Sequence, residues 1–134
     1  DVGRIIQAAY DSGDDQLKQS ALYAMGQSSN TDWLETVMIE MMHEDAAIRF
    51  EAANAGGLLG DEGDAPSLVQ LLGDEDSQVQ LAAVQALGRI GGPLAKKALE
   101  HCLKSDDEML EEAAAEALAD VDFDSDPLGF RMSV

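Results

Sequence analysis

The chain has 134 residues, 46% of them hydrophobic and only 4% aromatic, which is enough to fold one domain and favours packed helices over a β-sandwich. Its formal net charge of −19 disfavours binding to nucleic acid through a basic surface and binding to an anionic membrane. The same charge would attract a protein with a basic surface. The single cysteine, Cys102, excludes an internal disulfide and suits a reducing compartment, so we expect a cytoplasmic protein.

An internal repeat of 31 residues runs through the chain. An aspartate, an apolar residue, two alanines and a closing small residue each recur at this spacing in four copies. The series are Asp14, Asp45, Asp76 and Asp107; Leu17, Ile48, Val79 and Leu110; Ala21, Ala52, Ala83 and Ala114; Ala24, Ala55, Ala86 and Ala117; and Gly26, Gly57, Gly88 and Ala119. A register kept over four copies is the signature of a repeat architecture.

The repeat predicts about eight helices in a single domain, residues 1–134. In chain order the parts are a half-repeat at 2–10, full repeats at 14–42, 45–73 and 76–104, a closing helix at 107–121 and an acidic C-terminal tail at 122–134. Ile6 stands 31 residues before Val37, so the half-repeat corresponds to the second helix of a hairpin. We therefore expect the chain to be part of a longer repeat protein, with an open N-terminal repeat face that is available for self-association.

Each full repeat is predicted to form two antiparallel helices. From Val79 onward, apolar residues recur at helical spacing along one stripe, and Asp76 precedes the stripe where an N-cap is favourable. The segment Gly91-Gly92-Pro93 ends this first helix, and a second stripe, which begins at Leu34 in the first copy, marks the second helix. Because one hairpin cannot bury its apolar face alone, the hairpins must stack into an all-α solenoid.

The first helices resemble a known repeat family. Residues 76–91, DSQVQLAAVQALGRIG, and residues 48–53, IRFEAA, are similar to the HEAT-like repeats named after phycocyanobilin lyase subunits. The resemblance covers about residues 14–121 and implies an armadillo-like superhelix. It implies no single activity, because bilin lyase subunits, deoxyhypusine hydroxylase, certain DNA glycosylases and many interaction scaffolds share such repeats.

The metal-binding residues of the hydroxylase, and other common metal-ligand patterns, are missing from this sequence. The hydroxylase holds iron with His-Glu pairs in its first helices, and the corresponding pair here is Phe50-Glu51, without histidine. His43-Glu44 lacks the second histidine that a zinc helix needs, since Ala47 occupies that position, and His101-Cys102 has no further cysteine beside it. We therefore predict no catalytic residue, no metal site and no cofactor.

Exposed positions of the second helices form the predicted partner-binding surface, because the resemblance implies that these helices line the concave side. The third copy gathers Lys97, His101 and Lys104, a basic group in an acidic chain, and the first copy offers apolar contact. The predicted binding residues are Trp33, Glu35, Ile39, Met42, Gln70, Lys97, His101 and Lys104.

These observations favour a non-catalytic scaffold or adaptor that binds another protein through shape and surface chemistry. We expect no nucleic-acid partner and no membrane partner. The alternative is a subunit of a bilin (chromophore) lyase or of another cofactor-handling enzyme, because the pocket of such subunits has no short motif to search for. Added bilin would change the absorbance of a lyase subunit and leave that of a scaffold unchanged.

Overall fold

The computed structural model describes the backbone of residues 1–125 and the side chains of residues 1–122. Within this part the chain forms eight α-helices and two short 3-10 turns, η1 (Thr31–Trp33) and η2 (Glu62–Asp64), without a β-strand. The helices are α1 (Val2–Asp11), α2 (Asp15–Gln27), α3 (Leu34–Glu40), α4 (Ala46–Leu59), α5 (Ala65–Leu71), α6 (Ser77–Ile90), α7 (Gly92–Cys102) and α8 (Glu108–Ser125). The predicted all-α solenoid of eight helices is confirmed.

Aspartate side chains begin the first helix of every repeat, as the sequence predicts. Asp14 accepts hydrogen bonds from two backbone N–H groups in the first turn of α2. Asp45, Asp76 and Asp107 accept equivalent hydrogen bonds at α4, α6 and α8. Each carboxylate satisfies backbone donors that have no partner inside the helix, and its negative charge suits the helix N-terminus.

A second polar residue supports each of these caps from two positions earlier in the chain. The backbone N–H groups of the four aspartates donate to Ser12 Oγ, His43 Nδ1, Asp74 Oδ1 and Ser105 Oγ, in chain order. The 31-residue register therefore includes an acceptor before every cap, although its residue type changes from copy to copy.

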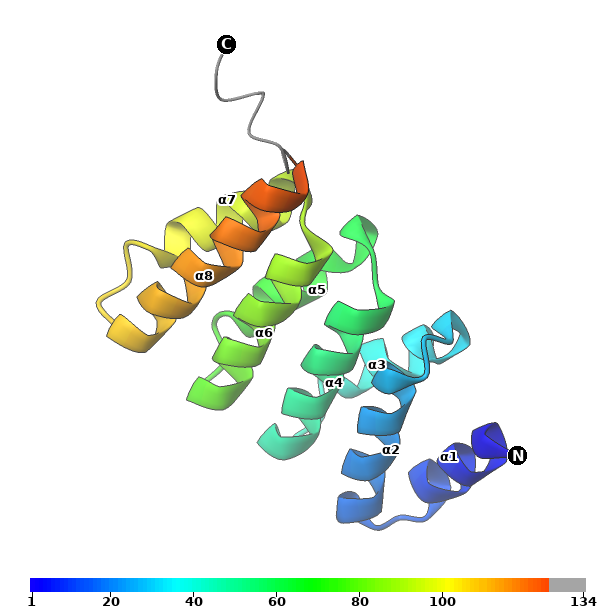
Figure 1. The fold of residues 1–134 in the computed structure, drawn as a ribbon. Helices are drawn as coiled ribbons and strands as arrows, with labels where there is room; N and C mark the ends of the chain where they lie inside the picture. Colours follow the sequence, from blue (N-terminus) through cyan, green and yellow to red (C-terminus); the bar gives the residue numbers. More distant parts are fainter. Residues whose placement is uncertain (126–134) are drawn as a thin grey trace.

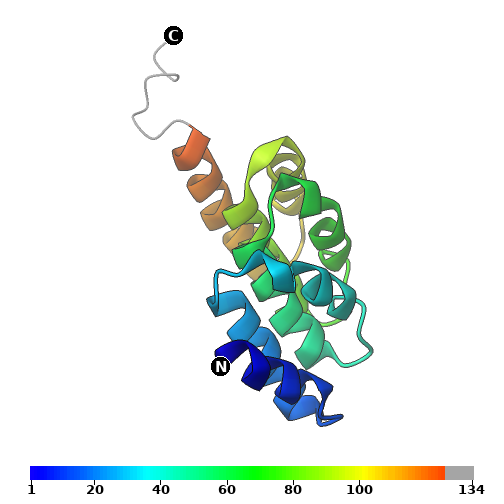
Figure 2. The ribbon, with the colours of Figure 1, turned by 90° about the vertical axis from the view of Figure 1, so that its right-hand side faces the viewer.

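The helices are arranged in two layers. α2, α4, α6 and α8 lie side by side in one layer, with α3, α5 and α7 behind them (Figure 1). The view turned by 90° shows the two layers from the side (Figure 2). In the first layer α4 packs against both α2 and α6, and α6 packs against α8, whereas α3 has no extensive contact with α5.

Glycines bring the helices of the first layer close together. A Cβ atom added to Gly57 would lie 2.6 Å from Ala86 Cβ and 2.7 Å from Ala86 Cα, so no side chain fits there. The Gly26–Ala55 and Gly88–Ala117 contacts repeat this arrangement, with nearest distances of 2.9 Å. α2, α4, α6 and α8 therefore pack closely against one another, whereas α3 makes little contact with α5. The expectation that the second helices line the concave side stays a prediction.

We call the exposed surface of α2, α4, α6 and α8 the inner face, and that of α3, α5 and α7 the outer face. The apolar stripes of both layers meet between them and form one continuous core. In the series that begins the first helices, Ile48 and Val79 are fully buried but Leu17 is 46% exposed. α1 adds the exposed side chains of Val2 and Ile5 at the same end of the stack. This end presents the apolar surface that self-association requires, and self-association stays a prediction.

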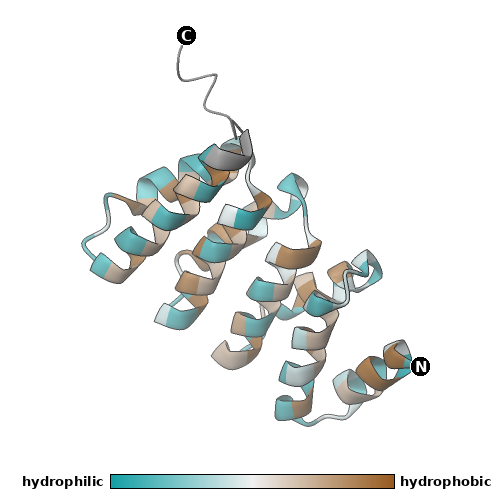
Figure 3. Cartoon of the chain, in the orientation of Figure 1, coloured by the Kyte–Doolittle hydropathy of each residue, from teal (hydrophilic) through white to brown (hydrophobic). Residues whose placement is uncertain are grey.

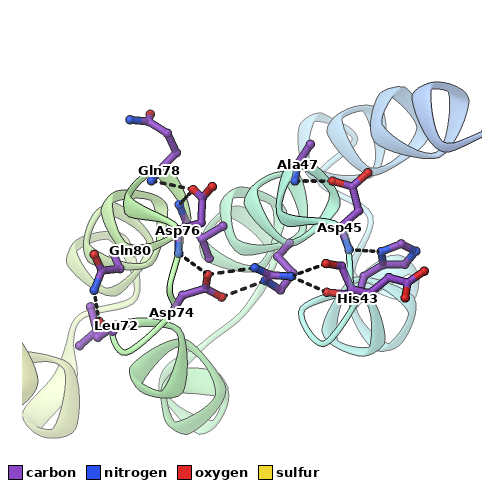
Figure 4. Close-up of polar contacts among 11 residues, drawn as sticks. His43, Asp45, Ala47, Leu72, Asp74, Asp76, Gln78 and Gln80 are labelled. Carbon is purple, nitrogen blue, oxygen red and sulfur yellow. Dashed lines mark hydrogen bonds and ion pairs between the residues drawn. The ribbon is translucent and has the colours of Figure 1, made fainter.

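A polar clasp joins the turn before α4 to the turn before α6 (Figure 4). Arg49 donates through Nε and Nη2 to the carboxylate of Asp74, at 2.8 and 3.0 Å. Its Nη1 donates to the carbonyl oxygens of His43 and Glu44. Burial opposes ionisation of Asp74, but the hydrogen bonds from Arg49 and from the Asp76 N–H outweigh it and hold the pKa of Asp74 below its usual value. The clasp thus fixes one repeat against the next.

Two helix boundaries carry information about the sequence. α6 ends where Gly91 adopts φ 69°, followed by Gly92 at φ 86°, so the predicted Gly-Gly-Pro stop is confirmed. α8 continues to Ser125, four residues beyond its predicted end at 121, because neither glycine nor proline interrupts this stretch. The helix thus includes the start of the predicted tail at 122–134, and residues 126–134 lie outside the described part.

Candidate functional site

Two rows of exposed or partly exposed side chains cross the inner face at the repeat spacing. The first row is Tyr23, Asn54, Gln85 and Glu116, and the second row is Gln27, Leu58, Arg89 and Asp120. Each row contributes one residue from each of α2, α4, α6 and α8, because the 31-residue register places equivalent positions at equivalent points of successive helices. In Figure 3 this layer faces the viewer, and hydrophilic and hydrophobic bands alternate along its helices.

The two rows border hollows between neighbouring helices. The first hollow, of about 250 Å³, spans α2, α4 and α6, with Gly26 and Ala55 at the helix contact and side chains of both rows around it. The second, of about 150 Å³, lies between α6 and α8. Gln85 and Arg89 line both hollows, so the hollowed surface continues across all four helices.

The first hollow holds two charged side chains that have no partner within residues 1–122. Glu51 of α4 and Arg89 of α6 both line it, and neither makes a hydrogen bond or an ion pair there. Burial raises the pKa of Glu51, and no neighbouring charge offsets that effect. Toward α8 the inner face becomes acidic, with exposed Glu112, Glu116 and Asp120.

The predicted partner-binding residues lie on the outer layer. Ile39 of α3 and Met42, just after α3, are exposed, as are Glu35 and Gln70, while Trp33 is partly buried against the core. Their role in binding stays a prediction.

The basic group of the third copy is brought together only in part. His101 and Lys104 line one hollow with Leu72 and the buried Cys102, whereas Lys97 lies exposed on α7 outside it. Burial raises the pKa of the Cys102 thiol, which keeps it in the weakly nucleophilic protonated form. This hollow therefore combines two basic side chains with a largely apolar lining, and its thiol is not activated.

The remaining candidate for chemistry, His43-Glu44, is part of the clasp. His43 Nδ1 accepts the hydrogen bond from the Asp45 N–H at 2.9 Å, so this nitrogen serves the helix cap. The described residues contain no group of three or more His, Cys, Asp or Glu side chains placed to hold a metal ion. They also contain no helix long and apolar enough to cross a membrane.

The inner-face rows were not predicted, although the signal for them is present in the sequence. The resemblance implies that the second helices line the concave side, and the repeat spacing then leads to the exposed positions of those helices instead. The glycines at 26, 57 and 88 indicate instead which helices pack most closely. Applied to the first helices, the same spacing finds Tyr23, Asn54 and Gln85.

Comparison with known proteins agrees with this architecture. A model of HEAT repeats matches residues 4–78 and 65–119. Among solved structures, the crystal structure of an engineered protein is similar, with 23% sequence identity and a TM-score of 0.63. That alignment covers 87% of this chain and 61% of the engineered chain, and at this identity it shows the fold alone. No curated protein is significantly similar to the chain.

Proposed function

Because the chain belongs to the HEAT-repeat family, we propose that it is a non-catalytic scaffold that binds an extended segment of another protein on its inner face. One observation supports this most directly: a hollowed surface runs across α2, α4, α6 and α8 and is bordered by two rows of exposed or partly exposed side chains. Tyr23 and Leu58 on this surface are 59% and 42% exposed. Large exposed apolar side chains beside a hollow are typical of binding surfaces.

The spacing of the rows suits an extended peptide. Neighbouring packed helices lie about 8–10 Å apart, and an extended chain rises about 3.3 Å per residue, so one repeat corresponds to about three residues of ligand. Asn54 and Gln85 carry amide groups that can both donate to and accept from a peptide backbone. A segment that crosses four helices would therefore place every third residue beside an equivalent rung.

The charge of the scaffold selects among partners. A net charge of −19 and an acidic α8 end favour a segment from a protein with a basic surface. Attraction between opposite charges increases the association rate of such a protein, and repulsion between like charges disfavours acidic competitors. The same field opposes nucleic acid and anionic membranes. We place this scaffold in the cytoplasm, since its single cysteine requires no oxidising compartment.

A pair of variants tests which face binds. We would compare proteins retained from a lysate of the source organism by the parent chain, by an inner-face variant, Tyr23→Ala/Leu58→Ala, and by an outer-face variant, Lys97→Glu/Lys104→Glu. The proposal expects the parent and the outer-face variant to retain the same partner and the inner-face variant to lose it. Loss with the outer-face variant alone would assign binding to the predicted residues on α7 and contradict the inner-face proposal.

A further inference from the structure

We propose that the first inner-face hollow recognises an arginine or lysine side chain of the partner segment, and that Glu51 is the residue that binds it. This inference rests on the proposed scaffold function, because it names the chemistry of the segment that the inner face binds. It assigns specificity to one rung of the surface, between α2, α4 and α6.

Glu51 is not required by the repeat. The equivalent positions in the other copies carry Ser20, Ala82 and Ala113, so the fold tolerates a small uncharged residue there. The carboxylate is nevertheless held in a partly buried position beside the hollow, without a hydrogen bond or ion pair within residues 1–122. Its pKa is raised by burial alone. A cation placed in the hollow would stabilise the ionised carboxylate and offset the cost of its desolvation.

The walls of the hollow suit the rest of a basic side chain. Tyr23 and Leu58 stand on α2 and α4 at its border, with large exposed fractions in the absence of a partner. An aromatic face and an aliphatic side chain can cover the methylene groups of lysine or stack with a guanidinium group. The hollow thus offers both an ion-pair partner and apolar contact to a single long cationic side chain.

Arg89 limits the number of cations that can bind there. It lines the same hollow but forms no ion pair with Glu51 or with any other residue among residues 1–122. Its positive charge would repel a second basic residue at that rung. We therefore infer a segment with one basic residue opposite Glu51, followed toward α6 by a neutral or acidic residue.

A random peptide library displayed on phage tests the proposal with the intact chain. Peptides selected on the parent chain would be synthesised, and their Kd measured by fluorescence anisotropy against the parent, Glu51→Gln, Glu112→Gln and Tyr23→Ala. Glu112→Gln is the matched control, because it removes the same charge from the inner face at a position that does not line the hollow. Circular dichroism of each variant confirms that the helices are intact.

The proposal expects selected peptides to share an arginine or lysine. Glu51→Gln should weaken their binding by about tenfold or more, the effect of losing one charge-assisted hydrogen bond at a partly buried site, while Glu112→Gln should weaken it by less than about threefold. Replacing the peptide arginine with citrulline should weaken binding to the parent equally and have little further effect on Glu51→Gln.

Two results would overturn the proposal, and they can be told apart. Peptides that lack a basic residue, or whose Kd changes with Tyr23→Ala and not with Glu51→Gln, would refute the role of Glu51 and leave the inner-face scaffold standing. Failure to select any peptide, or selection of peptides that are insensitive to both Tyr23→Ala and Glu51→Gln, would refute the inner-face scaffold together with the cation proposal.

Discussion

Replacing Gly57 with alanine adds a methyl group at a point where α4 and α6 leave no room for it. The added Cβ would lie 2.6 Å from Ala86 Cβ and 2.7 Å from Ala86 Cα. Ordinary carbon contacts are about 3.5–4.0 Å, so the two helices would have to separate by roughly 1 Å. One of the obstructing atoms belongs to the backbone, and rotation of a side chain cannot remove it.

The expected loss of stability follows from two opposing effects. Alanine is a better helix former than glycine by about 1 kcal/mol. Overpacking costs about 1–3 kcal/mol, and the upper end applies here because the clash involves the backbone at a fully buried helix crossing. The free energy of unfolding should therefore fall by about 2 kcal/mol. In a chain of this size the melting temperature should fall by roughly 8 °C.

Urea denaturation followed by circular dichroism measures this change. Gly3→Ala is the control, because its Cβ would meet only the side chain of Asp1, at 3.3 Å, so its stability should equal or slightly exceed that of the parent. The slope of the transition should be compared as well, since repeat arrays can unfold in parts. A Gly57→Ala chain as stable as the parent would refute the close packing of α4 and α6 on which the inner face depends.

Three further predictions concern the clasp, the partly buried Tyr10 and the N-terminal end of the stack. Asp74→Asn should lower the free energy of unfolding by about 2 kcal/mol at neutral pH, since it breaks a partly buried charge-assisted contact. Because the folded pKa of Asp74 is lowered, its contribution to stability is full above its unfolded pKa of about 4 and is lost as the pH falls through the folded pKa. The urea midpoints of parent and variant should therefore converge in acid. A difference between the two midpoints that does not change with pH would contradict this. Burial and the 2.7 Å hydrogen bond that Tyr10 donates to Glu40 raise the pKa of Tyr10 to about 12, so its phenolate absorbance step should occur near pH 12 and shift toward pH 10 in Glu40→Gln. Because the folded pKa is raised, the stability from this contact should be lost as the pH rises from about 10 to 12. A Tyr10 step already at pH 10 in the parent would refute this prediction. Salt at about 1 M screens the net charge, and under this condition sedimentation velocity should show concentration-dependent association of the parent chain and a monomer for Leu17→Ser. Equal sedimentation of both chains would exclude the apolar N-terminal end as the contact.

The fold was predictable because its determinants repeat in the sequence. Aspartates at a fixed spacing mark helix starts, and the same spacing finds the apolar stripes and the small residues at the helix crossings. Contacts whose residue types differ between copies were not predictable in this way. Arg49 pairs with Asp74. The equivalent positions in the other repeats carry Lys18, Gln80 and Glu111, so no repeated pattern in the sequence predicts the clasp.

Glycine 56 illustrates a second limit of repeat reasoning. The other copies have Met25, Leu87 and Leu118 at this position, and the sequence alone suggests drift or space for a ligand. The structure shows that the side chain of Met41, from the neighbouring α3–α4 turn, fills the space that a Cβ would need. A small residue at one position of the repeat is thus compensated by a large side chain from a different position. A single sequence gives no sign that these two positions meet.

The site predicted from the sequence and the site proposed from the structure lie on different layers for a physical reason. Periodicity identifies which residues of a helix are exposed, but it does not say which layer of a solenoid is compressed. That depends on interhelical distance, which here is set by Gly26, Gly57 and Gly88 against alanines of the next helix. That Glu51 and Arg89 have no ion-pair partner among residues 1–122 likewise depends on distances between helices and could not be obtained from spacing.

The central claim, that the inner face binds a protein partner, is tested most directly by site-specific photo-crosslinking. A photoreactive amino acid would replace Gln85 on the inner face in one chain and Gln70 on the outer face in another, a matched pair of exposed glutamines on α6 and α5. Mixed with the partner retained by the parent chain, the Gln85 position should crosslink to it and the Gln70 position should not. Crosslinking from Gln70 alone would contradict the inner-face account and place the partner on the second helices.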